Sequence, residues 1–444
     1  MLVCHDLFFS KGGIAASASH PLRQAVEKHK ARLQAELTKA RLRRKCATIA
    51  ALKEVAAAKT SRSGGVAQTV RWVRINTAKT SMEQQLRATF AGYTTVTDLV
   101  EVAQASPTAK VLKVDNNIPD LLALPPDIEL IRTKNYINGE IILQDKASCF
   151  PAYLLLGDSP VEMGDILDAC AAPGNKTTHL ASLAETARVI YACERDAARS
   201  AILKSMVERA GTKNVHILAK QDFLALNPND ARFADITHIL LDPSCSGSGI
   251  LGREDVPNLT LPSGPKASNG DCSATSSKKR KRQASPEPSQ TQEVLEYTAL
   301  PDGQERDDRL QKLANLQTQI VKHAFKFPSA CKISYSTCSV HVQENEHVVA
   351  RVLQDENWRL LRRDEQVEGM RKWPHRGSKD ISLTPKEDIA GLSPADFEAC
   401  IRCNPKDEMC TMGFFVVCFV RRGLPSDDQD QHEEEEWHGL NDSV

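Results

Sequence analysis

The chain has 444 residues, 41% of them apolar, and 57 Lys and Arg balance 57 Asp and Glu, so its formal net charge is zero. This length predicts two or three domains, or one large domain with extensions, and the apolar fraction predicts a real core. No apolar run reaches 18 residues, Met1–Phe9 lack a basic start, and there are 13 cysteines. These features predict no transmembrane helix, argue against a signal peptide at the start of the sequence, and predict a reducing compartment.

The charge is distributed unevenly. Residues 1–113 hold 19 Lys and Arg against 7 Asp and Glu, a surplus of 12 that suits phosphate binding. Residues 424–444 hold 8 acidic residues and no Lys or Arg, which predicts a disordered acidic tail.

The front of the chain is predicted to be a basic helical arm over residues 1–64. Residues 21–59 are rich in Ala, Leu, Glu, Lys and Arg with apolar residues near helical spacing, which predicts one long helix. Its basic block, Arg41–Lys45, is most simply a solvated helix face. Residues 65–140 alternate short strands and helices and predict a small α+β module, with strands at 70–75 and 110–114.

Residues 141–423 are predicted to form an α/β domain. Its strands are expected at 165–169, 188–192, 214–218, 236–241, 332–336 and 414–420, and two of its helices at 310–325 and 344–353. Residues 253–306 are rich in Ser, Pro, Gly and Lys and predict a disordered insertion. The basic run Lys278–Arg282 inside it is typical of a nuclear or nucleolar import signal, with an RNA-contacting patch as the alternative.

Acidic side chains stand at four successive strand ends: Asp168, Glu194, Asp222 and Asp242. Such sheets bind ligands at the carboxyl ends of their strands. Each carboxylate alone is most simply a helix cap or a solvated loop residue. Four in register suit a ligand with a ribose, an amino group and an exocyclic adenine amine, and S-adenosylmethionine has all three.

A turn of small residues follows the first of these strands and opens a helix. It comprises Cys170, Ala171, Ala172, Pro173, Gly174, Asn175 and Lys176. Small residues let a ligand approach the backbone, and the helix start presents free N–H groups. The turn matches neither a Walker loop nor the dinucleotide fingerprint, so an ordinary strand–helix turn is the alternative for this motif alone.

Two cysteines follow buried strands. Cys245 lies in Leu241–Gly247, and Cys338 lies in Ser336–Ser339. Cysteines at the carboxyl ends of strands suggest a thiol nucleophile and a second, assisting thiol. Free cysteine is otherwise usually a small buried hydrophobe, which is our interpretation of Cys170, Cys193, Cys331 and Cys418. Cys400, Cys403 and Cys410 lack a fourth ligand at zinc spacing, so no metal site is expected.

Together these segments resemble the RNA 5-methylcytosine methyltransferases of the Sun/RsmB/Nop family over about residues 141–423. The matching pieces are Gln144–Ser148, Asp168–Thr177, Glu194 with Arg199, Asp222, Asp242–Gly247, Ser334–Ser339 and Met412–Val416. Arg71–Thr77 is similar to the start of the family's RNA-binding region. The segment from His5 is similar to the subgroup that modifies large-subunit ribosomal RNA. The family usually carries more helical sequence before that segment, so we expect this chain to begin short of the family's N-terminus.

The resemblance implies a Rossmann-like, S-adenosylmethionine-dependent methyltransferase fold with a seven-stranded mixed sheet, an N-terminal helical arm and a small α+β RNA-binding module. It implies methylation of cytosine C5 in large-subunit ribosomal RNA, in the nucleolus, with neither a metal nor a membrane. Cys338 is the implied nucleophile, Cys245 assists release, Asp242 lies near the reacting centre, and Lys146 adds positive charge and orders the pocket. The residues implied to hold the cofactor are Cys170, Ala171, Ala172, Pro173, Gly174, Asn175, Lys176, Glu194, Arg199, Asp222 and Asp242.

Three alternatives stay open. A DNA cytosine-C5 methyltransferase uses the cysteine after the fourth strand as its nucleophile, whereas Thr337-Cys338 after the fifth strand favours RNA. A transfer RNA is another substrate class. A ribosome-assembly factor that keeps the fold but acts only by binding is the third, and the intact Cys338, Cys245, Lys176 and Asp242 argue against lost activity.

Overall fold

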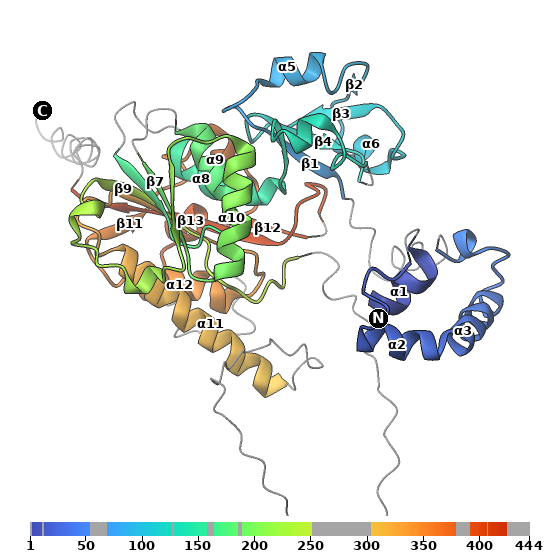
Figure 1. The fold of residues 1–444 in the computed structure, drawn as a ribbon. Coiled ribbons are helices and arrows are strands. Elements are labelled where there is room, and N and C mark those ends of the chain that lie inside the picture. Colours follow the sequence, from blue (N-terminus) through green and yellow to red (C-terminus); the bar gives the residue numbers. More distant parts are fainter. Residues whose placement is uncertain are drawn as a thin grey trace, which may run out of the picture. The chain divides into compact units, whose positions relative to one another are not determined.

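The computed structural model describes residues 2–10, 13–53, 69–126, 128–157, 164–184, 189–250, 303–378, 391–405 and 407–423 (Figure 1). The chain divides into two compact units, residues 1–68 and residues 69–444. The predicted acidic tail and the basic run at 278–282 lie outside the described residues. None of the described helices has both the length and the apolar character needed to cross a membrane.

The first unit is helical, but the single long helix predicted for residues 21–59 is wrong. The described helices include α1 (Leu2–Phe9), α2 (Pro21–Lys28) and α3 (Lys30–Arg43). The chain leaves helical geometry at His29, and Lys45 has a left-handed φ of 54°. Neither α2 nor α3 buries a residue. Helices gain most of their stability from packing, so nothing holds this sequence in one continuous helix.

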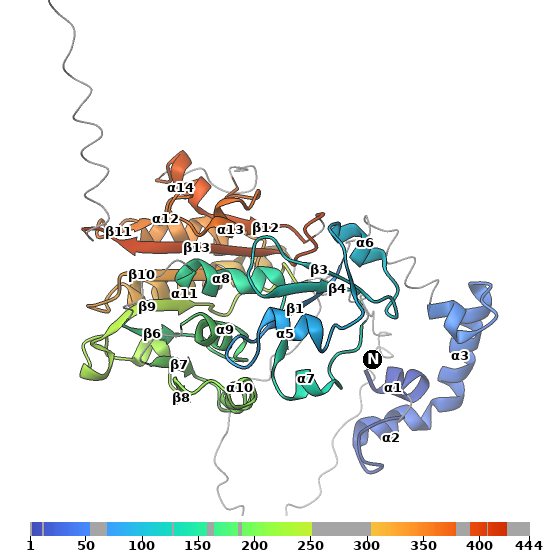
Figure 2. The same ribbon diagram turned by 90° about the horizontal axis from the view of Figure 1, so that it is seen from above.

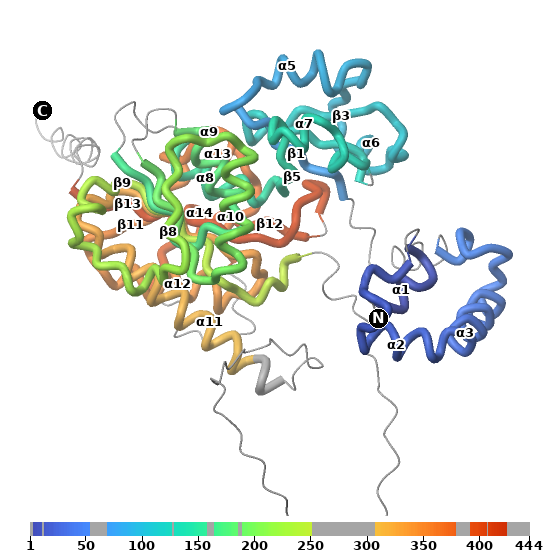
Figure 3. The backbone as a smooth tube through the Cα atoms, viewed as in Figure 1, coloured from blue at the N-terminus to red at the C-terminus, as the bar shows by residue number. Residues whose placement is uncertain are grey.

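The second unit begins with a small five-stranded sheet, shown in cyan tones with α5–α7 around it in Figure 3. The strand order is β2-β3-β4-β1-β5. Its strands are β1 (Arg71–Ile75), β2 (Thr94–Thr95), β3 (Val111–Val114), β4 (Leu121–Leu124) and β5 (Ile141–Leu143), and its helices are α5 (Met82–Arg87), α6 (Leu99–Gln104) and α7 (Lys134–Ile137). The strands predicted at 70–75 and 110–114 are confirmed.

The large sheet has the order β11-β13-β10-β9-β6-β7-β8, with β12 paired to β13 beside this seven-strand path. Strands β8, β7, β6, β9 and β10 run parallel, and β13 is antiparallel to β10, which confirms the mixed α/β sheet. The strands are β6 (Asp165–Asp168), β7 (Ile190–Glu194), β8 (Val215–Ala219), β9 (Ile236–Leu241), β10 (Lys332–Thr337), β11 (Trp358–Leu360), β12 (Ile401–Cys403) and β13 (Phe414–Arg421).

Helices cover both faces of this sheet (Figure 2). The elements between strands are α8 (Lys146–Leu156), α9 (Asn175–Leu183), α10 (Ala197–Ala210), η1 (Phe223–Ala225), η2 (Ala231–Phe233), α11 (Gly303–Ala324), η3 (Val342–Glu344), α12 (Glu346–Val352), α13 (Glu368–Arg371) and α14 (Pro394–Ala399). Alternate residues of β13 join opposite cores: Val416 packs with α8 and α9, and Phe415 with α11 and α12. Both faces are therefore buried, as parallel sheets require.

The insertion predicted for 253–306 extends too far, because α11 begins at Gly303. Residues 253–302 lie outside the described part of the chain. The helix was expected to begin at Leu310, where the regular helical spacing of apolar residues begins. The preceding polar residues gave no sign that they belong to the same helix.

Candidate functional site

Two sulfur atoms meet at the carboxyl edge of the large sheet. Strands β9 and β10 are parallel neighbours in register from Lys332 with His238 to Tyr335 with Leu241. Their following loops therefore leave the sheet at the same level. Cys245 Sγ and Cys338 Sγ lie 3.1 Å apart, a hydrogen-bonding distance, and both thiols are free. We call these two residues the thiol pair.

The surroundings of the thiol pair distinguish its two members. The hydrogen bond from Cys245 lowers the pKa of Cys338, and the nearby Lys176 ammonium acts in the same direction while burial and Asp242 oppose it. The hydrogen bond to Cys338, burial, and the charges of Cys338, Glu344 and Asp242 all raise the pKa of Cys245. Cys338 is thus the better thiolate and Cys245 the thiol that retains its proton.

An ion pair stands beside the thiol pair. Lys176 Nζ lies 2.7 Å from Asp242 Oδ2, and Ser336 Oγ donates to Asp242 Oδ1 at 3.0 Å. Burial opposes the charged lysine, but the Asp242 carboxylate outweighs it, so the pKa of Lys176 is raised. The ammonium also lies 5.4 Å from the centre of the Phe414 ring. Lys176 therefore stays a cation next to the reactive sulfur.

Backbone contacts join the two cysteine loops. Gly249 N–H donates to the Cys338 carbonyl at 3.0 Å, and Gly413 N–H donates to the Gly249 carbonyl at 2.8 Å. A Cβ at Gly249 would lie 2.1 Å from the Gly413 carbonyl oxygen, so only glycine fits there. This close approach places the segment before β13 against both cysteine loops.

The small-residue turn after β6 has the features of a ligand cradle. Gly174 caps α9 with a φ of 111°, and a Cβ there would meet Met206 at 3.0 Å. Asn175 Oδ1, at the helix start, is buried without a hydrogen-bond partner among the described residues. Arg199 donates to the Ala172 carbonyl at 2.6 Å and so supports the turn from α10. An unpaired buried oxygen beside free helix-start N–H groups fits a polar ligand.

The strand-end carboxylates line the same edge. Asp168 ends β6 and accepts a hydrogen bond from Thr177 at 2.7 Å, and burial raises its pKa to about 7. Glu194 ends β7, is buried, and lies 3.7 Å from Arg199. Asp222 follows β8, and its side chain is 42% exposed. The strand order β9-β6-β7-β8 brings the carboxyl ends of these four strands side by side, each with its acidic residue: Asp242, Asp168, Glu194 and Asp222.

Lys146 is placed differently from the other predicted site residues. Its ammonium contacts Asp115 at 2.6 Å and Asn117 at 2.8 Å, on the β3–β4 turn of the small sheet. It lies 5.3 Å from the Trp72 ring centre and 5.0 Å from that of Trp373. None of the hydrogen bonds and ion pairs described for Lys146 reaches the thiol pair. Its location favours the ordering role over a direct one.

Several residues of the site were missed by the sequence analysis. Glu344 and Gln317 bind the backbone around Cys245, and Asn345 accepts from Thr337 at 2.6 Å beside Cys338. A signal was present, since Glu344, Asn345 and Glu346 are consecutive polar residues that follow Cys338 closely and lie at the end of η3 and the start of α12. Arg74 of β1 was also missed: it is buried and donates to Gln144 and to Thr178 of α9.

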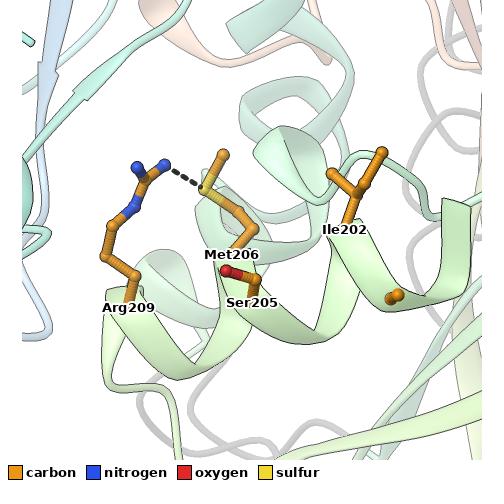
Figure 4. Close-up of a pocket in the computed structure, with 5 residues that line it drawn as sticks. Ile202, Ser205, Met206 and Arg209 are labelled. Carbon is orange, nitrogen blue, oxygen red and sulfur yellow. Dashed lines mark hydrogen bonds between the residues drawn. The ribbon is translucent and has the colours of Figure 1, made fainter. Parts of the chain in front are cut away.

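An open hollow lies on the outer face of α10 (Figure 4). It has a volume of about 360 Å³ and is lined by Ala201, Ile202, Ser205, Met206 and Arg209. Arg209 donates to the Met206 sulfur at 3.0 Å. None of the predicted site residues lines it. Within the described residues, no three His, Cys, Asp or Glu side chains are grouped so as to hold a metal ion.

Comparisons with known proteins identify the family to which the chain is similar. A family model for "16S rRNA methyltransferase RsmB/F" matches residues 154–262 and 302–388, and one for "NOL1/NOP2/Sun domain family member 5, ferredoxin-like domain" matches residues 69–144. A 25S rRNA (cytosine-C(5))-methyltransferase of Schizosaccharomyces pombe is 34% identical over 94% of this chain and 75% of its own length. A 28S rRNA (cytosine-C(5))-methyltransferase of Mus musculus is 34% identical over 89% and 70%.

The fold has a solved counterpart. The crystal structure of a methyltransferase homolog protein from Pyrococcus horikoshii superimposes with a TM-score of 0.51 and 21% identity, covering 80% of this chain and 87% of that one. At this identity the likeness concerns the fold alone, and it agrees with a Rossmann-like methyltransferase architecture.

Proposed function

This chain belongs to the Sun/RsmB/Nop family of RNA cytosine-C5 methyltransferases, and on that premise we propose that it methylates C5 of a cytosine in large-subunit ribosomal RNA with S-adenosylmethionine as methyl donor. The observation that carries this proposal is the thiol pair, with its sulfur atoms 3.1 Å apart beside the Lys176–Asp242 ion pair. The S. pombe and mouse relatives are both named as large-subunit rRNA enzymes, which supports that substrate class.

In the proposed mechanism, Cys338 activates the base. Its thiolate forms a bond to C6, the C5–C6 π electrons move to the C4–C5 bond and the C4–N3 π electrons to N3, and C5 of the resulting enamine is nucleophilic. S-adenosylmethionine, when bound, supplies the electrophilic methyl group that C5 takes up. The C5–H bond then breaks and its proton passes to solvent, its electrons re-form the C5–C6 double bond, and the C6–S electron pair returns to Cys338. Lys176 stabilises the thiolate before addition and after release.

The other site residues are assigned supporting roles. Cys245 stabilises the departing sulfur, and Asp242, held by Lys176 and Ser336, hydrogen-bonds the base or the cofactor near the reacting carbon. Lys146 orders the pocket through its contacts with the small sheet. The residues proposed to hold the cofactor are the turn Cys170–Lys176, Glu194, Arg199, Asp222 and Asp242. The unpaired Asn175 oxygen and the glycine cradle at Gly174 support this assignment.

The RNA substrate and the location follow from the same proposal. C6 is inaccessible in a stacked duplex, so the target base is unpaired or flipped out. The arm's exposed helices α2 and α3 carry several Lys and Arg that suit phosphate contacts. Because large-subunit ribosomal RNA is the proposed substrate, we propose that the protein acts in the nucleus, at the nucleolus, with pre-ribosomal RNA as its partner.

A covalent trap tests the proposal. We would express the wild type, Cys245→Ala, and Cys245→Ala/Cys338→Ala in cells and compare them on denaturing gels with RNase or DNase treatment. Addition without release predicts a slowly migrating band in the single variant alone, removed by RNase. Sequencing the trapped RNA identifies the target cytosine.

The other outcomes point to the alternatives. A DNase-sensitive band that persists without Cys338 would indicate a DNA methyltransferase. Trapped transfer RNA would move the substrate to that class. No band in any variant would contradict covalent catalysis and favour an assembly factor that acts by binding.

A further inference from the structure

A buried polar cluster lies under the Cys245 loop, and the mechanism above makes no use of it. Its members are Glu344 of η3, Gln317 of α11 and Tyr335 of β10, and none of them has any exposed surface. Burying polar groups costs free energy unless hydrogen bonds compensate. Their hydrogen-bond partners therefore indicate what the cluster does.

The cluster holds the backbone on both sides of Cys245. On the C-terminal side, Ser246 N–H donates to Glu344 Oε1 at 2.9 Å. On the N-terminal side, Gln317 Nε2 donates to the Ser244 carbonyl at 3.0 Å. The same Gln317 amide donates to Glu344 Oε1 at 3.0 Å. One carboxyl group and one amide thus fix the loop that aims the Cys245 sulfur.

Tyr335 connects this arrangement to the other cysteine. Its hydroxyl donates to the Glu344 backbone carbonyl at 2.6 Å. Tyr335 lies on β10, the strand that leads directly to Cys338. The backbone segments that carry the two sulfur atoms are therefore tied through Glu344, and their separation does not depend on the sulfur contact alone.

One oxygen of the Glu344 carboxyl group is buried at a cost in folding free energy. This oxygen, Oε2, is buried without a hydrogen-bond partner among the described residues. An unsatisfied buried oxygen of this kind costs about 1–3 kcal/mol in general. Such groups call for a functional reason when they occur in native structures. Here the carboxyl group faces the loop of a reactive thiol.

We propose that Glu344 is a positioning residue for the release step, which holds Cys245 so that its thiol donates a hydrogen bond to the sulfur of Cys338 as that sulfur leaves C6. This inference rests on the proposed function. At release the C5 proton passes to solvent, the C5–H electrons form the ring double bond, and the C6–S pair returns to Cys338. A hydrogen bond to that sulfur stabilises the thiolate it becomes.

The charges around the thiol pair agree with this direction of donation. The hydrogen bond to Cys338, burial and then the nearby Cys338 and Glu344 charges raise the pKa of Cys245. Cys245 therefore keeps the proton that it offers. Replacing Glu344 with alanine removes the hydrogen bond that holds the loop at Ser246. It also removes one of the charges that raise the pKa of Cys245.

The test is the same covalent trap, applied to the full chain with cellular RNA as the probe. Glu344→Ala is expected to accumulate the RNase-sensitive adduct, as Cys245→Ala does, with release slowed about 10- to 100-fold, because a displacement of about 1 Å costs about that much. Glu344→Gln keeps an oxygen that accepts from Ser246 N–H and is expected to release normally. Gln317→Met preserves volume but removes the amide that donates to both the Ser244 carbonyl and Glu344, so it is expected to accumulate adduct although Glu344 itself is unchanged.

Controls separate positioning from folding. Gln366 is a matched buried glutamine that donates to the Ala399 carbonyl at 2.9 Å and makes no described contact with either cysteine loop. Gln366→Met should lose stability without accumulating adduct. Binding of S-adenosylhomocysteine identifies the variants that are folded, and if Glu344→Ala fails to fold, Gln317→Met decides.

The possible results distinguish the two proposals. Adduct in Cys245→Ala but not in folded Glu344→Ala or folded Gln317→Met would overturn this inference and leave the proposed function intact. Equal adduct in Glu344→Ala and Glu344→Gln would also overturn it, because the hydrogen bond to Ser246 would then be irrelevant. Absence of adduct in Cys245→Ala would instead overturn the proposed function.

Discussion

Two Lys–Asp pairs in this molecule have nearly the same separation but differ in burial and in surroundings. Lys176 lies 2.7 Å from Asp242, with side chains 13% and 28% exposed, next to the thiol pair. Lys146 lies 2.6 Å from Asp115, with both side chains 4% exposed, near two tryptophan rings. An ion pair alone is therefore no indication of catalysis. Its position relative to the reactive sulfur and to solvent determines what its charge can do.

The largest expected effect tests whether the Lys176 pair does serve a reacting centre. Cys338→Ala should reduce methyl transfer by something on the order of 10⁶-fold, as loss of a covalent nucleophile can. Affinity for S-adenosylhomocysteine should be unchanged, since Cys338 lies outside the turn after β6. Methyl transfer to cellular RNA and calorimetric binding provide the two measurements. Retained activity would remove Cys338 as nucleophile.

Mutation of the Lys146–Asp115 pair should chiefly change the stability of the protein. Lys146→Met leaves the buried Asp115 carboxylate without its cationic partner, with the backbone N–H groups of Asn117 and Ile118 as its remaining partners among the described residues, and should lower the free energy of unfolding by about 3 kcal/mol. Adding Asp115→Asn removes that charge and should recover part of the loss. Denaturant unfolding of the single and double variants measures this. A large fall in the activity of folded Lys146→Met protein, without a stability change, would contradict the comparison.

Mutation of the Lys176–Asp242 pair should chiefly change the rate of methyl transfer. Lys176→Met removes the cation beside Cys338 and should lower the methyl-transfer rate by about 10²- to 10³-fold, the effect typical of one lost electrostatic group at a reacting centre. The pKa of Cys338 should rise, because the ammonium lowers it. The pH dependence of thiol alkylation is the direct measurement. An alkylation profile identical to that of the wild type would show that Lys176 does not act on this sulfur.

A pH-dependent effect on stability tests whether the charge of Asp242 also acts on the neighbouring carboxyl group of Asp168. Burial, opposed by the Thr177 hydrogen bond and aided by Asp242, raises the pKa of Asp168 from 3.8 to about 7. The folded state therefore binds this proton more tightly than the unfolded state. The resulting stability is fully present below about pH 4 and is lost as the pH rises through 7, by up to about 1.4 kcal/mol per pH unit in between.

Asp168→Asn should remove that pH dependence. The difference in unfolding free energy between wild type and variant, measured from pH 4 to pH 8, isolates this one group. A constant difference across the range would mean that Asp168 is ionised throughout.

Much of the fold was predictable because strands carry local signals. Short apolar runs with flanking turn residues located β6, β9, β10 and β13 closely, and the family resemblance identified the cysteines that follow two of them. The long helix at 21–59 was predicted from composition and spacing and is wrong. The spacing of apolar residues shows which face a helix could bury against other elements. Neither α2 nor α3 buries a residue, so no packing holds the segment in one helix.

The partners of individual side chains were not predictable in the same way. Asp115 and Asn117 lie 31 and 29 residues before Lys146, and Gln317 lies 73 residues after Ser244. Nothing local to Glu344 indicates that its carboxyl group accepts from Ser246. Such contacts require the small sheet, α11 and the cysteine loops to be packed together first.

The amino-acid sequence by itself determined the α/β alternation, the carboxylates at successive strand ends, and the two cysteine motifs, because strand period and turn chemistry act over a few residues. Only the tertiary structure decided which lysine stands beside the sulfur atoms, that these atoms lie 3.1 Å apart, and that Glu344 supports one of them. Those outcomes depend on strand order and on packing between segments far apart in the chain, where burial and hydrogen bonding select one arrangement.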